Sequence, residues 1–159
     1  MYNSVLFAKY IVAKANSCGI SINMTKVQKL LYIAYGVYLA VCNERLLNEH
    51  PQAWPYGPVF PTTRNHLLKE DFYKIALDDP EFEILKGDKN IDGLLKLVFG
   101  TYGNWTASML SAWSHQNGSP WERAVNRLGF KWGDPINDDD IQGYFKMKMK
   151  LQFCFMYIS

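Results

Sequence analysis

The helix predicted after Ser21 or Asn23, either of which can cap it, constrains the fold more than any other part of the chain. Apolar residues at i, i+3, i+4 and i+7 indicate one buried helix face. That face consists of Val27, Leu30, Leu31, Ala34, Tyr38 and Val41. More apolar residues lie off this stripe, namely Tyr32, Ile33, Tyr35 and Leu39. Such a helix must be covered on more than one side, so we expect it to be the central helix of a domain.

Most of the remaining chain also carries helical signals. Cap residues and apolar spacing predict further helices from Asn3 or Ser4 to about Ser17, after Pro58 or Pro61 to Lys69, over 91–102, after Thr106 to His115, after the Ser119–Glu122 capping box, and from Asn137 onward. We therefore expect a mainly α, single compact domain of six or so helices, with room for a short β-hairpin. Its predicted core contains Leu30, Leu31, Ala34, Leu94, Leu95, Val98, Leu110 and Trp121.

Two segments fit this scheme less well. Residues 70–89 carry mixed charges and few apolar residues, which predicts a variable excursion with room for one short strand. Residues 146–159 alternate apolar and polar side chains with a period of two, which favours a strand. We divide the chain into a helical domain at 1–145 and an apolar C-terminal tail at 146–159. The tail either packs onto its own domain or docks to a partner.

Composition limits the cellular context and the partners. A chain of 159 residues fits one domain that buries about 70% of its unfolded surface. Its three cysteines are far apart and form no CxxC, which favours a reducing cytoplasm. A net charge of +2 does not favour nucleic acid as the main partner. No apolar run reaches the roughly 20 residues that span a bilayer, so we expect a soluble protein without a membrane partner.

The sequence does not predict catalytic residues, a metal or a cofactor. His50, His66 and His115 lie in different segments, without an HExxH, GxSxG or P-loop pattern. We interpret His115 as an imidazole favoured at a helix C-terminus. Asp138–Asp140 could bind Mg²⁺, but a solvated helix start explains the run better. Two helices joined around Gly19 also resemble a helix-turn-helix, which keeps DNA binding as an alternative.

Several motifs together resemble one known family. The runs MTKVQKLLYIAYG and AWPYGPVFP, a helix that ends in SH, the SPW that follows and a closing IQGYF occur in this order over roughly residues 5–145. This set is similar to the Panacea domain of GepA-like phage-associated proteins and SocA-like antitoxins. The chain departs from the family pattern at Arg64 and Ser114, and its tail after Phe145 matches no part of it.

The resemblance implies a mainly helical antitoxin that neutralises a toxin encoded beside it. Neutralisation in the family is usually direct complex formation, so the implied partner is a cognate toxin protein. Some relatives instead deliver the toxin to an ATP-dependent protease, which would be a second partner. A small DNA-binding regulator or enzyme from a prophage or other mobile element stays the alternative function.

The proline-rich run around Trp54 is our candidate partner-binding site. Prolines at 51, 55, 58 and 61 fix φ and so lower the entropy that a loop loses when a partner immobilises it. The candidate residues are Trp54, Tyr56, Gly57, Pro58, Phe60 and Arg64. For Trp54 we favour a brace against the central helix. For Tyr56 and Arg64, bracing and partner contact stay equally open.

Overall fold

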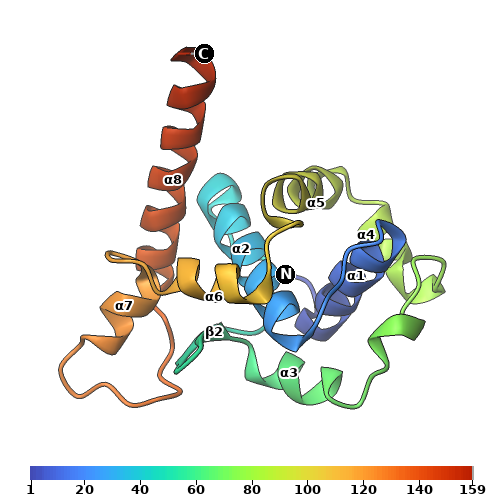
Figure 1. Cartoon of the computed structure of the whole chain (residues 1–159), viewed down its shortest axis with the longest axis horizontal. Coiled ribbons are helices and arrows are strands. Elements are labelled where there is room, and N and C mark those ends of the chain that lie inside the picture. Colours follow the sequence, from blue (N-terminus) through green and yellow to red (C-terminus); the bar gives the residue numbers. More distant parts are fainter. Residues whose placement is uncertain (159) are drawn as a thin grey trace.

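The computed structural model describes the backbone of residues 1–158 and the side chains of residues 1–150. This part of the chain is a mainly helical domain with one two-stranded hairpin, as predicted (Figure 1). The helices are α1 (Ser4–Ser17), α2 (Met24–Cys42), α3 (Pro61–Leu67), α4 (Glu83–Lys86), α5 (Lys89–Tyr102), α6 (Ala107–Ser114), α7 (Pro120–Val125) and α8 (Asp138–Ile158). Two 3₁₀ turns, η1 (Phe72–Lys74) and η2 (Pro80–Phe82), precede α4, and β1 (Gln52–Trp54) pairs with β2 (Gly57–Val59).

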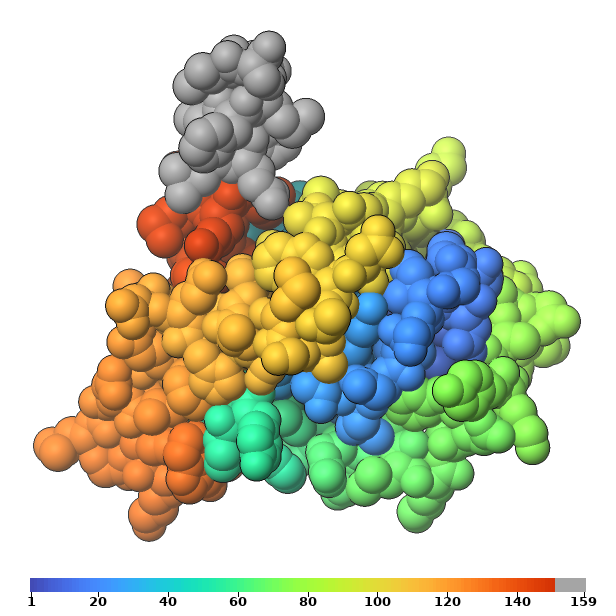
Figure 2. Space-filling view, in the orientation of Figure 1, coloured from blue at the N-terminus to red at the C-terminus, as the bar shows by residue number. Residues whose placement is uncertain are grey.

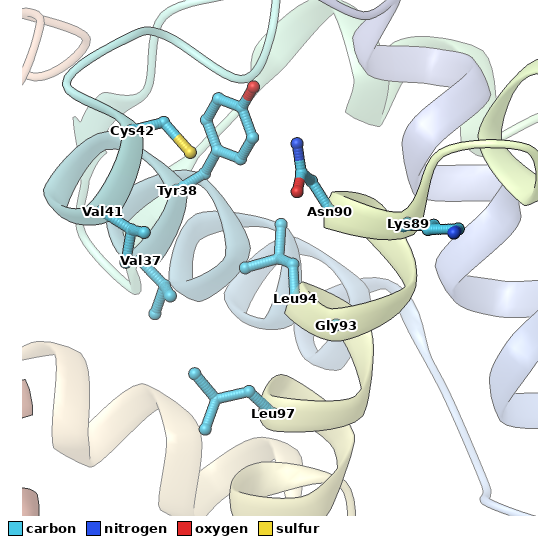
Figure 3. A pocket seen from close by; sticks show the side chains of 9 residues that line it. All are labelled: Val37, Tyr38, Val41, Cys42, Lys89, Asn90, Gly93, Leu94 and Leu97. Carbon is cyan, nitrogen blue, oxygen red and sulfur yellow. The ribbon is translucent and has the colours of Figure 1, made fainter.

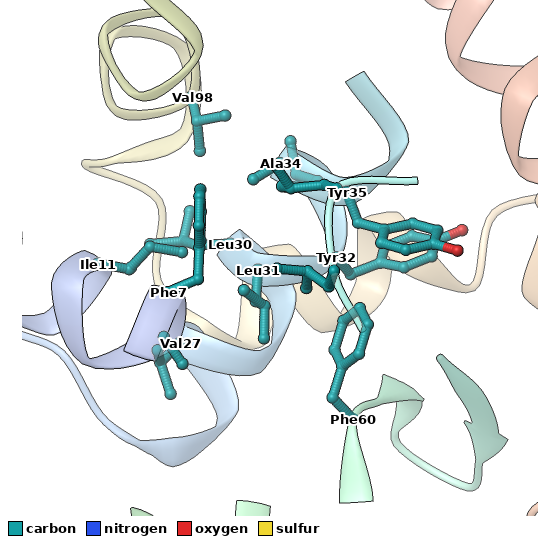
Figure 4. Close-up of a cluster of buried hydrophobic side chains, with 14 of the residues drawn as sticks. Phe7, Ile11, Val27, Leu30, Leu31, Tyr32, Ala34, Tyr35, Phe60 and Val98 are labelled. Atoms are coloured by element: carbon teal, nitrogen blue, oxygen red, sulfur yellow. The ribbon is translucent and has the colours of Figure 1, made fainter. Parts of the chain in front are cut away.

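The predicted central helix is α2, which packs against α1, α3, α5, α6, α8 and β2. Its residues from Val27 to Ala34 are buried on every side (Figure 4). Of the predicted core, every residue is buried except Trp121, which is only half-buried. The prediction for Trp121 is corrected, because its indole must reach out to the hairpin that lies beside α7.

Local capping signals are confirmed where the sequence places them. The side-chain oxygen of each cap residue accepts a hydrogen bond from a backbone N–H two or three residues later. The cap residues are Asn3, Asn23, Thr106, Ser119 and Asn137. In the capping box, however, the Glu122 carboxylate bonds the backbone N–H of Gly118 rather than that of Ser119. The box therefore also holds the turn that leads into α7.

Two secondary-structure predictions are wrong. Residues 70–89 contain the two 3₁₀ turns and α4 but no strand, and the hairpin lies instead in the proline-rich run. The predicted C-terminal strand is the continuation of α8, which runs unbroken to Ile158. Lys, Met, Leu and Gln are good helix formers, so propensity overrides the period of two here. How the side chains of the tail pack lies outside the described residues.

The helix-turn-helix interpretation also fails in this structure. A recognition helix must expose the face that enters the major groove. Helix α2 is instead enclosed, and the two lysines in its first turns that could contact phosphate, Lys26 and Lys29, are buried. Their ammonium groups donate to the backbone oxygens of Gly103 and Pro58.

Helix α8 crosses α2 at close range. A Cβ at Gly36 would lie 2.2 Å from the Phe145 ring, so only glycine allows this approach. At the start of α8, the Tyr35 hydroxyl donates to Asp138 Oδ1 at 2.6 Å, and Arg45 Nε donates to that hydroxyl at 3.2 Å. These contacts fix where α8 leaves the body of the domain.

Candidate partner-binding surface

The predicted site is a tight hairpin whose turn consists of Pro55 and Tyr56. Strands β1 and β2 are antiparallel, and Trp54 pairs with Gly57. The hairpin lies at the surface between α6 and the segment 119–137 (Figure 2). Gly57 has φ +107°, a conformation that L side chains rarely adopt. The turn therefore depends on glycine at this position.

Side chains from helices α6 and α7 hold the turn by its backbone. Three consecutive carbonyl oxygens, those of residues 54–56, each lie within hydrogen-bond distance of a side chain from one of these helices. The pairs are Trp121 Nε1 with Trp54 O at 2.8 Å, His115 Nε2 with Pro55 O at 3.1 Å, and Ser111 Oγ with Tyr56 O at 3.0 Å. The turn is therefore fixed through main-chain atoms, and its side chains are left for other contacts.

Helix α2 holds the second strand from beneath. Lys29 is 1% exposed, and its ammonium group donates to Pro58 O at 2.9 Å. Burial lowers the pKa of Lys29 to about 8, because the charged form loses its hydration. Gln28 Oε1 accepts the backbone N–H of Phe60 at 2.8 Å. A Cβ at Gly57 would lie 2.9 Å from the Lys29 side chain, so lysine and glycine fit together.

The outer edge of β1 is also covered. Ala53 N donates to Asp134 O at 2.9 Å, and Gly133 N donates to Ala53 O at 2.9 Å. Gln52 forms an isolated bridge with Pro135. The segment before α8 thus acts as a third strand along β1. Helix α2 covers the other edge of the sheet, that of β2. A partner cannot extend this small sheet by adding a strand, so recognition must use side chains.

His115 joins the hairpin to α6 through both ring nitrogens. Nδ1 lies 2.6 Å from Ser111 O, and Nε2 lies 3.1 Å from Pro55 O. Both neighbours are acceptors, so a neutral imidazole can donate to only one of them, and an imidazolium to both. The ring also packs edge-on against Trp121, with centroids 4.1 Å apart. His115 does end α6, as interpreted from the sequence, and its ring also contacts the hairpin and Trp121.

The six predicted site residues divide into two groups. Tyr56 is 78% exposed, and Trp54 and Arg64 are half-exposed. Gly57, Pro58 and Phe60 are buried, and Phe60 packs its ring against Tyr35 in the core. These three position the hairpin from inside and cannot offer side chains to a partner. The candidate contact surface narrows to Trp54, Tyr56 and Arg64.

The Trp54 indole has a polar partner on β1 and a cationic partner on α3. Its Nε1 donates to Gln52 Oε1 at 3.1 Å, and the Arg64 guanidinium lies over the ring at 5.6 Å from the centroid. Such a cation–π pair orients both side chains. These two contacts brace Trp54, and the predicted brace against the central helix stays a prediction.

Several contributors were missed at the sequence level. Gln28, Lys29 and Ser111 anchor the hairpin but were not predicted as site residues. Gln28 and Lys29 are polar residues beside the apolar stripe of α2, which is an unusual signal. Trp132 is 56% exposed, and its ring lies 6.3 Å from that of Trp121. It extends the aromatic surface beyond the hairpin, and only the fold brings it there.

The structure contains few features of other site types. Among residues with described side chains, no group of three His, Cys, Asp or Glu residues could hold a metal ion. Over the same part of the chain, no helix has the length and hydropathy needed to cross a membrane.

The chain is similar to proteins of one known family. The family model described as "Antitoxin SocA-like, Panacea domain" matches residues 27–122, a range that contains the hairpin and its anchors on α2, α6 and α7. Antitoxin SocA of Caulobacter vibrioides (strain NA1000 / CB15N) is 30% identical over 141 residues, covering 79% of this chain and 72% of the relative. No solved structure is significantly similar to the chain. The chain belongs to the SocA-like, Panacea domain family of antitoxins.

Proposed function

We propose that this antitoxin neutralises its cognate toxin by binding it directly through the hairpin surface, which we define as Trp54, Tyr56, Arg64 and Trp132. The observation that carries the proposal is the fixed turn. Its backbone carbonyls are held by α6 and α7, while the Tyr56 ring is 78% exposed. A ring presented on an immobile backbone loses little entropy on binding. Tyrosine, tryptophan and arginine are also the residues most enriched in interface hot spots.

The charge of Arg64 indicates the chemistry of the toxin surface. Its guanidinium stacks on Trp54, and the described side chains include no carboxylate that forms an ion pair with it. The planar guanidinium therefore keeps its hydrogen-bond donors for an incoming carboxylate. We infer that the toxin presents an acidic group beside an apolar patch. Such a partner would pair with Arg64 while the aromatic rings bury apolar area.

The test uses the double variant Tyr56→Ala with Arg64→Glu, co-expressed with the product of the adjacent toxin gene. We expect loss of protection from growth arrest and loss of complex formation in a pull-down. The melting temperature should stay close to that of the unchanged protein, because neither the Tyr56 side chain on the turn nor the Arg64 side chain on α3 is buried in the core. The matched control is Tyr73→Ala with Lys74→Glu, at exposed positions of η1, which should still protect.

The outcomes separate recognition from bracing. If the double variant loses binding and melts at a lower temperature, these residues brace the hairpin. If it still protects cells, the toxin binds another surface. Only lost binding with unchanged melting supports the proposal.

The proposal assigns binding rather than catalysis to the chain. It places the complex in the cytoplasm, where an adjacent toxin gene would be expressed. Two modes of neutralisation lead to different toxin levels. With simple capping, co-expression restores growth while the amount of toxin stays constant. With delivery to an ATP-dependent protease, the toxin disappears, and inactivating the protease restores its level. Measuring growth and toxin level together decides between them.

A further inference from the structure

The turn between α6 and α7 contains the one asparagine–glycine pair of the sequence, Asn117–Gly118. Both residues are exposed. Ser119 N donates to Gln116 O at 3.0 Å, and Gly118 has φ +78°, as the third residue of a type II turn does. The turn hydrogen bond does not use the Gly118 N–H. The Asn117 side chain and the nitrogen that follows it therefore lie next to each other at the surface.

An exposed pair of this kind can deamidate without an enzyme. The Gly118 nitrogen gives up its proton and attacks Asn117 Cγ. The new N–Cγ bond closes a succinimide ring, the bond between Cγ and the side-chain nitrogen breaks, and that nitrogen leaves with the proton as ammonia. Water then opens the ring at either carbonyl, which leaves aspartate or isoaspartate at position 117. Glycine favours the attack because it has no Cβ beside the nitrogen.

The Glu122 carboxylate controls access to the Gly118 nitrogen. A Cβ at Gly118 would meet no atom within 4 Å, so no packed element crowds this position. Glu122 accepts the Gly118 N–H as part of the capping box of α7. The nitrogen must lose its proton to attack, and a carboxylate beside it disfavours the negative charge that this leaves. Attack on Asn117 is therefore slow while the box is closed and proceeds when the end of α7 frays.

Exposure alone does not distinguish Asn117 from other asparagines. Asn90 is also exposed and lines a hollow between α2 and α5 (Figure 3). That hollow is open enough to leave Val41, which the sequence predicted on the buried face of α2, 62% exposed. The nitrogen after Asn90 donates to Asp88 Oδ1 at 3.4 Å, and it belongs to the β-branched Ile91. It is therefore both hindered and held at the start of α5.

Asn104 offers a comparison closer in the chain. It is exposed in the turn before α6, but the residue after it is tryptophan. Trp105 N donates to the backbone oxygen of Tyr102 at 3.0 Å, and the indole packs edge-on against the Tyr102 ring. That nitrogen is held by the main chain and flanked by a large side chain. Asn117 differs from Asn104 in both respects.

The turn at Asn117 joins the two helices that hold the hairpin (Figure 1). Helix α6 supplies Ser111 and His115, and α7 supplies Trp121. Isoaspartate adds a methylene group to the main chain between these helices. Either product also places a second carboxylate near that of Glu122. Both changes weaken the turn, because like charges repel and the helix ends no longer keep their spacing.

We propose that Asn117–Gly118 is a site of spontaneous deamidation, and that the reaction loosens the turn between α6 and α7. The hairpin carbonyls then lose part of their support, so the hairpin surface keeps its shape for a limited time. The consequence for toxin binding rests on the function proposed above. The chemical step does not depend on it.

The test incubates the full chain for several days at neutral pH and follows it by peptide mapping. Trypsin releases residues 97–123 as one peptide, which contains both Asn104 and Asn117. Fragmentation in the mass spectrometer locates each acid that replaces an amide, with a sample digested before incubation as the background. We expect conversion at Asn117 and several times less at Asn104, and isoaspartyl methyltransferase should label the incubated chain. No conversion at Asn117, or an equal amount at Asn104, overturns the proposal.

Two single substitutions test the roles of the residues. Asn117→Gln is the matched control, since the longer side chain would have to close a larger and less favourable ring, and it should stay unlabelled. Glu122→Gln keeps an acceptor of the same shape but removes the charge. We expect several times faster conversion of Asn117 in this variant. A rate equal to or below that of the unchanged chain would refute the protective role of the carboxylate.

Melting temperature and toxin binding are then compared between the incubated unchanged protein and incubated Asn117→Gln. We expect a lower melting temperature and weaker binding in the unchanged protein alone. Conversion with an unaltered melting temperature overturns the loosening of the turn. Conversion with a lower melting temperature and full toxin binding supports the deamidation site and refutes the hairpin surface as the toxin site. The two proposals can therefore fail separately.

Discussion

Replacing Lys29 by methionine should change how the stability of the protein depends on pH. Burial lowers the pKa of Lys29 from 10.5 to about 8, which corresponds to roughly 3 kcal/mol of lost stability while the lysine is charged. Between pH 8 and pH 10.5 the unfolded chain holds this proton and the folded protein does not. The contribution of Lys29 to the free energy of unfolding therefore rises with pH in this window and is constant below pH 8.

Tyrosines limit the useful window at its upper end. Burial raises the pKa of Tyr144 to about 12, and burial together with a hydrogen bond to Asp88 does the same for Tyr2. Near pH 10 the unfolded chain begins to lose tyrosine protons that the folded protein keeps, so stability falls above that pH. The tyrosines titrate alike in the unchanged protein and in Lys29→Met, so the Lys29 contribution is the difference in free energy of unfolding between the two proteins. We expect this difference to change by about 2 kcal/mol between pH 8 and pH 10.

The Lys29→Met variant removes the buried charge but leaves Pro58 O without its donor. An unsatisfied buried carbonyl costs about 1–3 kcal/mol, similar to the relief from removing the charge. At pH 7 the variant should be about as stable as the unchanged protein or slightly more stable. At pH 10, where the unchanged lysine is largely neutral, the variant should be the less stable of the two.

Urea unfolding followed by circular dichroism at pH 7, 8, 9 and 10 measures this prediction. Lys74→Met is the control, because the Lys74 side chain is 83% exposed, and it should keep the pH dependence of the unchanged protein between pH 8 and pH 10. If Lys29→Met shows that same pH dependence, the buried lysine does not contribute to it and the reasoning fails.

Three further predictions concern the fold around the hairpin. Leu31→Ala should lower the free energy of unfolding by about 2–5 kcal/mol, since Leu31 is fully buried, and an unchanged denaturation midpoint would contradict this. Gly57→Ala should weaken toxin binding, because its φ of +107° and the Ser114 Oγ, 2.5 Å from the new Cβ, would displace the turn; unaltered affinity in titration calorimetry would refute it. Glu49→Gln should destabilise the start of α3, since the Glu49 carboxylate accepts N–H groups there, and a melting temperature equal to that of the unchanged protein would argue against this role.

Sequence patterns within about four residues predicted most of the secondary structure. Side chains at Asn23, Thr106 and Ser119 cap their helices as expected, because a cap depends only on residues two or three positions away. The all-round apolar character of α2 likewise predicted its central place. The alternation of apolar and polar residues after Lys146 led to a wrong prediction of a strand. The residues there are good helix formers, and their helix propensity continues α8.

The candidate binding surface could be predicted only in part from the sequence. Prolines and exposed aromatics marked the hairpin, since their effect on backbone freedom is local. Its anchors lie far away in the chain: Trp121 is 67 residues from the carbonyl that it binds, and His115 is 60. Hydrogen bonds over such separations exist only after α2, α6 and α7 have packed together. The sequence alone determined most of the helices and the proline-rich turn, whereas tertiary packing decided which side chains of the turn stay exposed, because burial depends on elements that no local pattern brings together.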